Sequence, residues 1–219
     1  MEITASMVKE LREATGAGMM DCKKALSECN GNMDEAGNWL REKGIAKSAK
    51  KESRIAAEGL ANIFINGNKA VVIEVNSETD FVSKNDEFKA MIEEIGTTIL
   101  NSDAKDMDSA LALSCSEGTI KDLIIAKTAK IGEKLSLRRF EVVEKEDTDN
   151  FGAYLHMGGK IASLIVTAGA SEEVAKDVAM QAAAMKPQYP GSVIYNSENY
   201  IYNCNEEKQQ RIWLVAGLK

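Results

Sequence analysis

The sequence has few of the residues on which covalent chemistry and metal binding usually depend. Histidine occurs once, as His156, and the four cysteines are widely spaced with no Cys-x-x-Cys pair. One histidine and scattered cysteines do not give the ligand spacing of a metal site. The sequence also lacks a G-x-x-x-x-G-K-S/T loop and a G-x-G-x-x-G turn after a strand, the two familiar nucleotide-binding patterns. We therefore predict no metal, no cofactor and no enzyme activity.

Long apolar runs and a secretory leader are missing as well. No hydrophobic stretch approaches the roughly 18 residues that a membrane-spanning helix needs. Hydrophobic residues make up 44% of the chain and charged residues 28%, which is typical of globular proteins. Cysteines without a pairing pattern are typical of a reducing compartment. These features predict a folded cytoplasmic protein with no membrane contact.

The formal net charge of −7 argues against nucleic acid as a direct partner, because an acidic chain repels a phosphate backbone. One stretch is basic, with Arg41, Lys43, Lys47, Lys50, Lys51 and Arg54. It has no interleaved aromatic side chains, so a solvated helix face is favoured. A contact with nucleic acid or with an acidic partner is the alternative interpretation of this stretch.

Proline occurs only at Pro187 and Pro190, so few imposed breaks are expected in residues 1–186. Three short helices are predicted in residues 1–44. Thr4 and Asn32 are expected N-caps, and Gly44 is expected to end the third helix. Trp39 lies on the apolar face of that helix and is expected inside the bundle. With a polar, basic connector after it, this first predicted domain spans residues 1–54.

A second predicted module, residues 55–144, is built on a β-hairpin. Asn66-Gly67-Asn68 is a hairpin turn signal between two β-branched stretches. The elements expected in order are strands 60–65 and 70–75, a loop at 76–85, a helix with Phe88, Met91, Ile92, Ile95 and Ile99 on its apolar side, helical stretches 106–113 and 117–130, and a strand at 135–143.

The hairpin and helix then recur. A shift of 91 residues aligns Lys69 with Lys160 and Ile73 with Leu164, so the hairpin, loop and helix at 60–100 correspond to those at 152–184. A single hairpin with one helix buries little apolar surface, whereas two such units can share or flank a sheet. We therefore predict an α+β fold with a three-helix bundle and two related hairpin-plus-helix subdomains, the second of which spans residues 145–186.

The loop that follows the first hairpin is unusual, because Asp80 and Phe81 stand together in a polar stretch of a chain with only 5% aromatic residues. In one interpretation, Phe81 and Val82 fold back as a hydrophobic staple on the next helix. In the other, Phe81 projects as a wedge and Asp80 directs a carboxylate toward a partner. Residue pattern alone favours the staple and leaves the wedge open.

Four motifs resemble translation elongation factor Ts of bacteria and organelles. They are LREATGAGMMDCKKAL at 11–26, NSETDFVSK at 76–84, AKIGEKLSLRRFE at 129–141 and HMGGKIASLIV at 156–166. The four motifs occur in family order within residues 1–186. The resemblance implies a ubiquitin-associated-like (UBA-like) three-helix bundle followed by a two-subdomain core.

The resemblance also implies guanine-nucleotide exchange on elongation factor Tu, a GTPase that holds GDP tightly. Three contact segments with this partner are implied: Leu11, Thr15, Gly16, Met19 and Met20 in the bundle; Thr79, Asp80, Phe81 and Val82 in the intruding loop; and His156, Gly158 and Gly159 in the second subdomain. The phenylalanine of the intruding loop is expected to disturb the region around the partner's bound magnesium. By the residues alone, Gly158-Gly159 is interpreted as a hairpin turn in preference to a phosphate cradle. The alternative interpretation of His156 is a hairpin histidine satisfied by neighbouring backbone groups.

The resemblance is expected to end near Pro187 and Pro190. Family members commonly continue into a helical hairpin, a QPFV-type segment, a closing strand and a carboxy-terminal helix, none of which we identify in residues 187–219. That stretch is predicted to be a divergent tail and the second subdomain incomplete, which favours a homodimer as a further partner. The alternative function is a non-catalytic adaptor with a UBA-like module, and an enzyme using His156 is a distant third.

Overall fold

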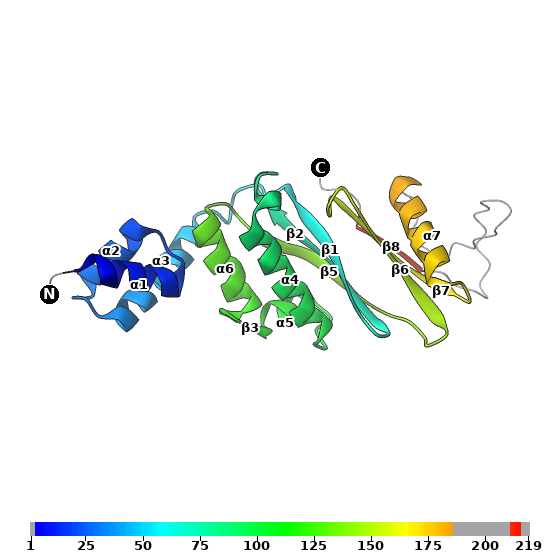
Figure 1. Ribbon diagram of the computed structural model, residues 1–219, viewed down its shortest axis with the longest axis horizontal. Helices are drawn as coiled ribbons and strands as arrows, with labels where there is room; N and C mark the ends of the chain where they lie inside the picture. Colours follow the sequence, from blue (N-terminus) through cyan, green and yellow to red (C-terminus); the bar gives the residue numbers. More distant parts are fainter. Residues whose placement is uncertain (1–2, 186–210, 216–219) are drawn as a thin grey trace.

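The structure is a computed structural model that describes residues 3–185 and, as backbone, residues 211–215. Three helices open the chain: α1 (Ala5–Thr15), α2 (Met19–Glu28) and α3 (Met33–Ala49). The Thr4 hydroxyl accepts from the Met7 N–H, and the Asn32 side chain accepts from the N–H groups of Asp34 and Glu35. Both predicted caps therefore form, and Figure 1 shows the bundle at one end of an elongated molecule.

Helix α3 does not end at Gly44 as predicted but continues to Ala49. A glycine inside a helix costs only about 1 kcal/mol relative to alanine, and tertiary packing overrides that preference. Here the packing partner is α6 (Ile120–Ile131), whose Ala129 lies close to Gly44. Trp39 is half-buried against the bundle core, with the Lys43 ammonium 4.6 Å from its ring centroid. The predicted connector is thus in large part a helix that joins the bundle to the next module.

The first hairpin-plus-helix unit is close to the predicted one. Strands β1 (Glu58–Asn66), β2 (Lys69–Ser77) and β5 (Ser136–Glu144) form an antiparallel sheet in the order β1-β2-β5. Its remaining elements are η1 (Val82–Lys84), α4 (Asp86–Leu100), α5 (Met107–Leu111), α6, and the two-residue strands β3 (Ser114–Cys115) and β4 (Gly118–Thr119), which were not predicted. Val71, Ile73 and Val75 alternate along β2 and pack with α4 and α6 into the largest core.

The second unit holds β6 (Asp149–His156), β7 (Ile161–Ala168) and α7 (Glu172–Met185), and adds a strand that the sequence did not indicate. Strand β8 (Arg211–Val215) pairs antiparallel with β7, giving the sheet order β6-β7-β8. The expectation that no closing strand follows residue 186 is therefore wrong. The reason is tertiary, because β7 offers an open ladder of backbone groups and a short apolar segment pairs with it from a distance. The other parts of the predicted tail lie outside the described residues.

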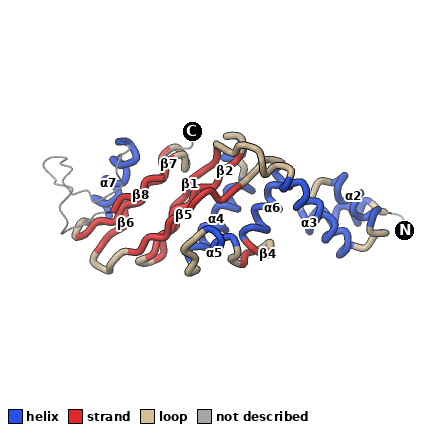
Figure 2. Tube along the Cα trace, turned by 180° about the vertical axis from the view of Figure 1, so that it is seen from behind, coloured by secondary structure: helices blue, strands red, loops and turns tan. Residues whose placement is uncertain are grey.

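The two sheets pack face to face, as Figures 1 and 2 show from opposite sides. Their contact is a layer of small and medium side chains: Ala61, Ala70, Val72, Val143, Ala162, Leu164 and Val166. Helices α4 and α6 cover the outer face of the first sheet, and α7 covers the outer face of the second. The α+β class is confirmed. None of the helices in the described part of the chain combines the length and apolar character needed to cross a lipid bilayer.

Candidate functional site

The loop between β2 and α4, residues 78–85, divides its two apolar side chains between solvent and core. Phe81 is 77% exposed, whereas Val82 is 6% exposed and belongs to the core of the first unit. Asp80 is exposed beside Phe81. The staple interpretation thus holds for Val82 alone. The ring of Phe81 is free of the core and stands at the surface.

This loop is held by hydrogen bonds at both ends. The Ser83 hydroxyl donates to the Asp80 carbonyl at 2.6 Å, and the Lys84 N–H donates to the Phe81 carbonyl at 3.2 Å. Asn85 caps α4 by accepting from the Glu87 N–H at 2.8 Å. These hydrogen bonds close the turn and fix it to the start of α4. Phe81 is therefore exposed on an ordered turn.

Two carboxylates tie the start of the loop to the segment that follows α6. Glu133 accepts from the Thr79 N–H at 2.9 Å and from the Thr79 hydroxyl at 2.7 Å. Glu78 accepts from the Lys134 N–H at 2.6 Å and from the Arg54 guanidinium at 3.3 Å. The Lys134 N–H and then Arg54 lower the pKa of Glu78. Residue-by-residue reasoning missed Glu133 and Glu78, although Glu133 lies in the quoted motif at 129–141.

The β6–β7 turn carries the second predicted contact segment. His156 is exposed, and its Nδ1 lies 3.3 Å from the Tyr154 hydroxyl. Met157 is 74% exposed, with a φ of 50°, and Gly158 follows it at the surface. Gly159 is buried, where its carbonyl accepts from the Ala61 N–H at 2.8 Å. The turn is therefore fixed to β1, and the side chain of His156 lies next to that of Tyr154.

The structure brings this turn and the β2–α4 loop to the same end of strand β1. Glu58 at the start of β1 pairs in register with Ser77, the last residue of β2. The Glu58 carboxylate also accepts from the Lys160 ammonium at 2.6 Å. The loop with Phe81 and the turn with His156 therefore flank one strand end.

The bundle carries the third predicted segment at a separate place. Met19 and Met20 are 59% and 77% exposed at the start of α2, and Thr15 is exposed at the end of α1. Leu11 is only 2% exposed and packs in the bundle core, so its side chain supports the bundle from inside. Gly16 ends α1 in the left-handed conformation, and its backbone lies next to the Lys130 side chain. Of this segment, the methionines and Thr15 are the residues available to a partner.

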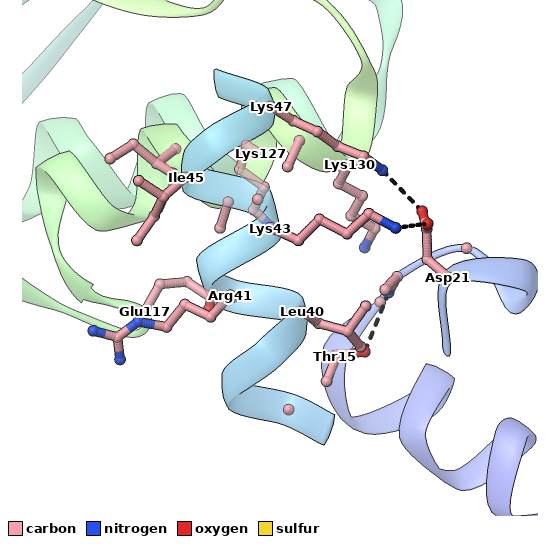
Figure 3. A pocket seen from close by; sticks show the side chains of 18 of the residues that line it. Thr15, Asp21, Leu40, Arg41, Lys43, Ile45, Lys47, Glu117, Lys127 and Lys130 are labelled. Atoms are coloured by element: carbon pink, nitrogen blue, oxygen red, sulfur yellow. Dashed lines mark hydrogen bonds and ion pairs between the residues drawn. The ribbon is translucent and has the colours of Figure 1, made fainter. Parts of the chain in front are cut away.

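A hollow of about 680 Å³ lies where the α1–α2 connection, α3 and α6 meet (Figure 3). Lys43 and Lys47 both bind the Asp21 carboxylate in it, at 2.8 and 2.9 Å, and together they lower the pKa of Asp21. On the α6 side, Lys130 and Lys127 bind Glu87 and lower its pKa to about 2. Lys43 and Lys47 of α3 are thus engaged with the Asp21 carboxylate of this same chain.

Within residues 3–185 and 211–215, no cluster of three His, Cys, Asp or Glu side chains is placed to hold a metal ion. The exposed apolar side chains Phe81, Met157, Met19 and Met20 stand on fixed loops and helix starts. The described residues define an α+β protein whose exposed apolar side chains lie in two places, at the start of α2 in the bundle and on the two loops beside the start of β1.

Comparison with known proteins agrees with this class and narrows it. The family model described as Elongation factor TS matches residues 78–198. A curated relative from Limosilactobacillus fermentum, named "Elongation factor Ts", is 55% identical over 188 residues, which is 86% of this chain and 64% of the relative. The chain belongs to the elongation factor Ts family. The matched range passes Pro187 and Pro190, so the family resemblance does not end there as expected.

Proposed function

We propose that this chain binds elongation factor Tu in its GDP form and promotes release of the nucleotide, in support of translation elongation. The observation that carries the proposal is the 77% exposure of Phe81 on a loop closed by hydrogen bonds. Contact between an aromatic ring and water is unfavourable. A ring that stays exposed on a folded protein is removed from water only when a partner covers it.

The proposed mechanism uses the loop as a wedge. Phe81 enters a region of the GTPase near its bound magnesium, and the Asp80 carboxylate competes there for hydrogen-bond donors. Magnesium and the surrounding donors compensate the charge of GDP phosphates, so displacing the segment that orders them weakens nucleotide binding. By linkage, tight binding of this chain to the nucleotide-free GTPase lowers nucleotide affinity by the same factor. No bond is made or broken by this chain.

The other two segments act as docking contacts in the proposal. The bundle, proposed to be UBA-like, binds through Met19, Met20 and Thr15. The turn with His156 and Gly158 binds beside the wedge, since it flanks the same strand end as the loop. A two-point contact fixes the wedge in orientation, and orientation is what converts binding into nucleotide release.

Replacement of the wedge residue tests the proposal. We expect Phe81→Ala to lower the maximal rate of fluorescent GDP release from elongation factor Tu by about tenfold, which is about 1.4 kcal/mol of barrier. Since the ring is exposed, the free energy of unfolding should change by less than about 0.5 kcal/mol. Stopped-flow release and urea unfolding measure the two quantities.

The matched control is Ile65→Ala, which truncates a partly exposed apolar residue near the opposite end of β1. Release should be unchanged in this variant. Wild-type chain that does not accelerate release at all contradicts the exchange proposal. Wild-type chain that binds the GTPase without accelerating release supports the adaptor instead.

A further inference from the structure

Two short segments of the first unit exchange carboxylate hydrogen bonds across the fold. Glu133 accepts from the backbone and hydroxyl of Thr79, and Glu78 accepts from the backbone of Lys134. Each segment thus supplies the acceptor for a backbone N–H of the other. The four residues 78, 79, 133 and 134 form a reciprocal clasp between the wedge loop and the end of α6.

The α6 side of this clasp is rigid. Gly132 caps the carboxy-terminal end of α6. It adopts the left-handed conformation and donates its N–H to the Thr128 carbonyl at 3.1 Å. The Leu135 N–H donates to the Thr128 hydroxyl at 3.3 Å, and both residues are buried. Glu133 and Lys134 therefore project from a corner that is fixed on both sides.

On the loop side, the clasp supplies the contacts of Thr79 with a distant segment, beside the local hydrogen bond that the Ser77 hydroxyl donates to the Thr79 carbonyl at 3.0 Å. Regular strand pairing of β2 ends at Ser77, and the next apolar side chain fixed in the core is Val82. Thr79 lies between these two anchors, two residues before Phe81. The two hydrogen bonds from Thr79 to one carboxylate set the direction in which the backbone enters Asp80 and Phe81. Hydrogen bonds to a charged acceptor are about twice as strong as neutral ones, so this fixing is substantial.

We propose that Glu133 is a positioning residue for nucleotide exchange, which holds the loop so that Phe81 projects toward the partner. This inference rests on the proposed exchange function and adds a residue to it that touches neither the nucleotide nor the partner. Glu133 acts through Thr79. Its loss should slow nucleotide release with little effect on how tightly the chain docks, because the docking contacts of the bundle and of the β6–β7 turn stay in place.

Two variants at this position separate geometry from charge. Glu133→Ala removes both acceptors. Glu133→Gln keeps the connection, since its amide oxygen accepts from the Thr79 N–H and its amide nitrogen donates to the Thr79 hydroxyl. Glu141→Ala is the matched control, because Glu141 is exposed on β5 and forms no ion pair within the described residues.

We expect Glu133→Ala to lower the maximal GDP release rate by about tenfold and to change the half-saturating concentration by less than about twofold. Glu133→Gln should keep about half or more of the wild-type rate. Hydrogen–deuterium exchange at the Thr79 amide should be about tenfold faster in Glu133→Ala and near wild type in Glu133→Gln. Glu141→Ala should resemble the wild type in all three measurements.

The possible results separate this inference from the function on which it rests. Wild-type chain without exchange activity overturns the proposed function, and the Thr79 amide still reports whether Glu133 fixes the loop. Active wild type with an equally active Glu133→Ala overturns the positioning role alone. Equal losses in Glu133→Ala and Glu133→Gln that follow a lowered unfolding temperature overturn it as well, because they indicate a merely structural residue.

Discussion

The two hairpin-plus-helix units share a topology and differ in where each places its surface residues. In the first unit, the connection from β2 to α4 is long and exposes Phe81. In the second, β7 ends at Ala168 and α7 already begins at Glu172. With the offset of 91, Phe81 corresponds to Glu172, the first residue of α7. The same chain position is thus a projecting ring in one unit and a helix start in the other.

Helix capping explains this difference. In the first unit Asn85 accepts from the Glu87 and Phe88 N–H groups, so α4 begins after it. In the second unit Ser171, which corresponds to Asp80, accepts from the Val174 N–H, and its carbonyl accepts from the Ala175 N–H. A cap placed earlier turns the corresponding residues into the first turn of a helix. The two units therefore share a topology, and the length of the loop before the helix depends on the position of one capping side chain.

The cores of the two units differ in the size of the helix side chains. Phe88 and Met91 on α4 correspond to Ala179 and Ala182 on α7. Large side chains on α4 pack against the first sheet, whereas alanines let α7 approach the second sheet closely. The unit with the wedge loop is thus the one with the larger apolar core beneath it.

Truncating the helix core should give the largest effect and test the difference in core size. Phe88 is fully buried, so Phe88→Ala should cost about 3–5 kcal/mol of unfolding free energy. At the corresponding position of the second unit, Ala179→Gly should cost about 1 kcal/mol, mostly from helix propensity. Urea unfolding with wild type as reference measures both. Similar losses of unfolding free energy in the two variants would show that the size of the helix side chains does not distinguish the two cores.

Close approach of helix and sheet gives the next effect. A Cβ on Gly152 of β6 would lie 1.9 Å from the Ala175 carbonyl oxygen, a backbone atom. A Cβ on Gly96 of α4 would lie 1.9 Å from the Phe64 ring, which is a side chain and not backbone. Gly152→Ala should therefore cost about 2–3 kcal/mol through overpacking, and Gly96→Ala should cost less, partly offset by helix propensity. Thermal unfolding of the pair decides the order, and a larger loss for Gly96→Ala contradicts the argument.

The caps should give the smallest effect on stability and the clearest one on function. Asn85→Ala and Ser171→Ala should each cost about 1 kcal/mol, because each removes one acceptor from a helix start. Only Asn85→Ala should slow GDP release, since Asn85 fixes the end of the loop that carries Phe81. Parallel unfolding and release measurements test this. Equal slowing by Ser171→Ala would remove the distinction between the two units.

Sequence reasoning predicted the elements of the first unit well because their signals are local. The Asn66-Gly67-Asn68 turn and the apolar side of α4 each depend on neighbouring residues. It failed where distant segments decide the outcome. Gly44 does not end α3, because α6 packs on that helix, and β8 joins β7 from a segment with no family signal recognised in advance.

The candidate site was predicted in part for the same reason. Motif resemblance named Thr79, Asp80 and Phe81, but residue pattern alone favoured folding Phe81 inward. Motif resemblance also named Leu11 as a contact, although that side chain is buried in the bundle. Glu133 went unnoticed because its role depends on Thr79, which lies far from it along the chain. The contact residues themselves remain predictions until the variants are measured.

The amino-acid sequence by itself determined most of the helices, long strands and turns of residues 3–185, since periodicity, caps and turn residues act over a few positions. It also determined the repeat and the family. The tertiary structure alone decided that Val82 is buried while Phe81 is exposed, that the turn at His156 lies beside the wedge loop, and that Glu133 holds Thr79. These outcomes depend on which distant groups meet in the folded chain, and a long-range contact leaves no periodic signal in the sequence.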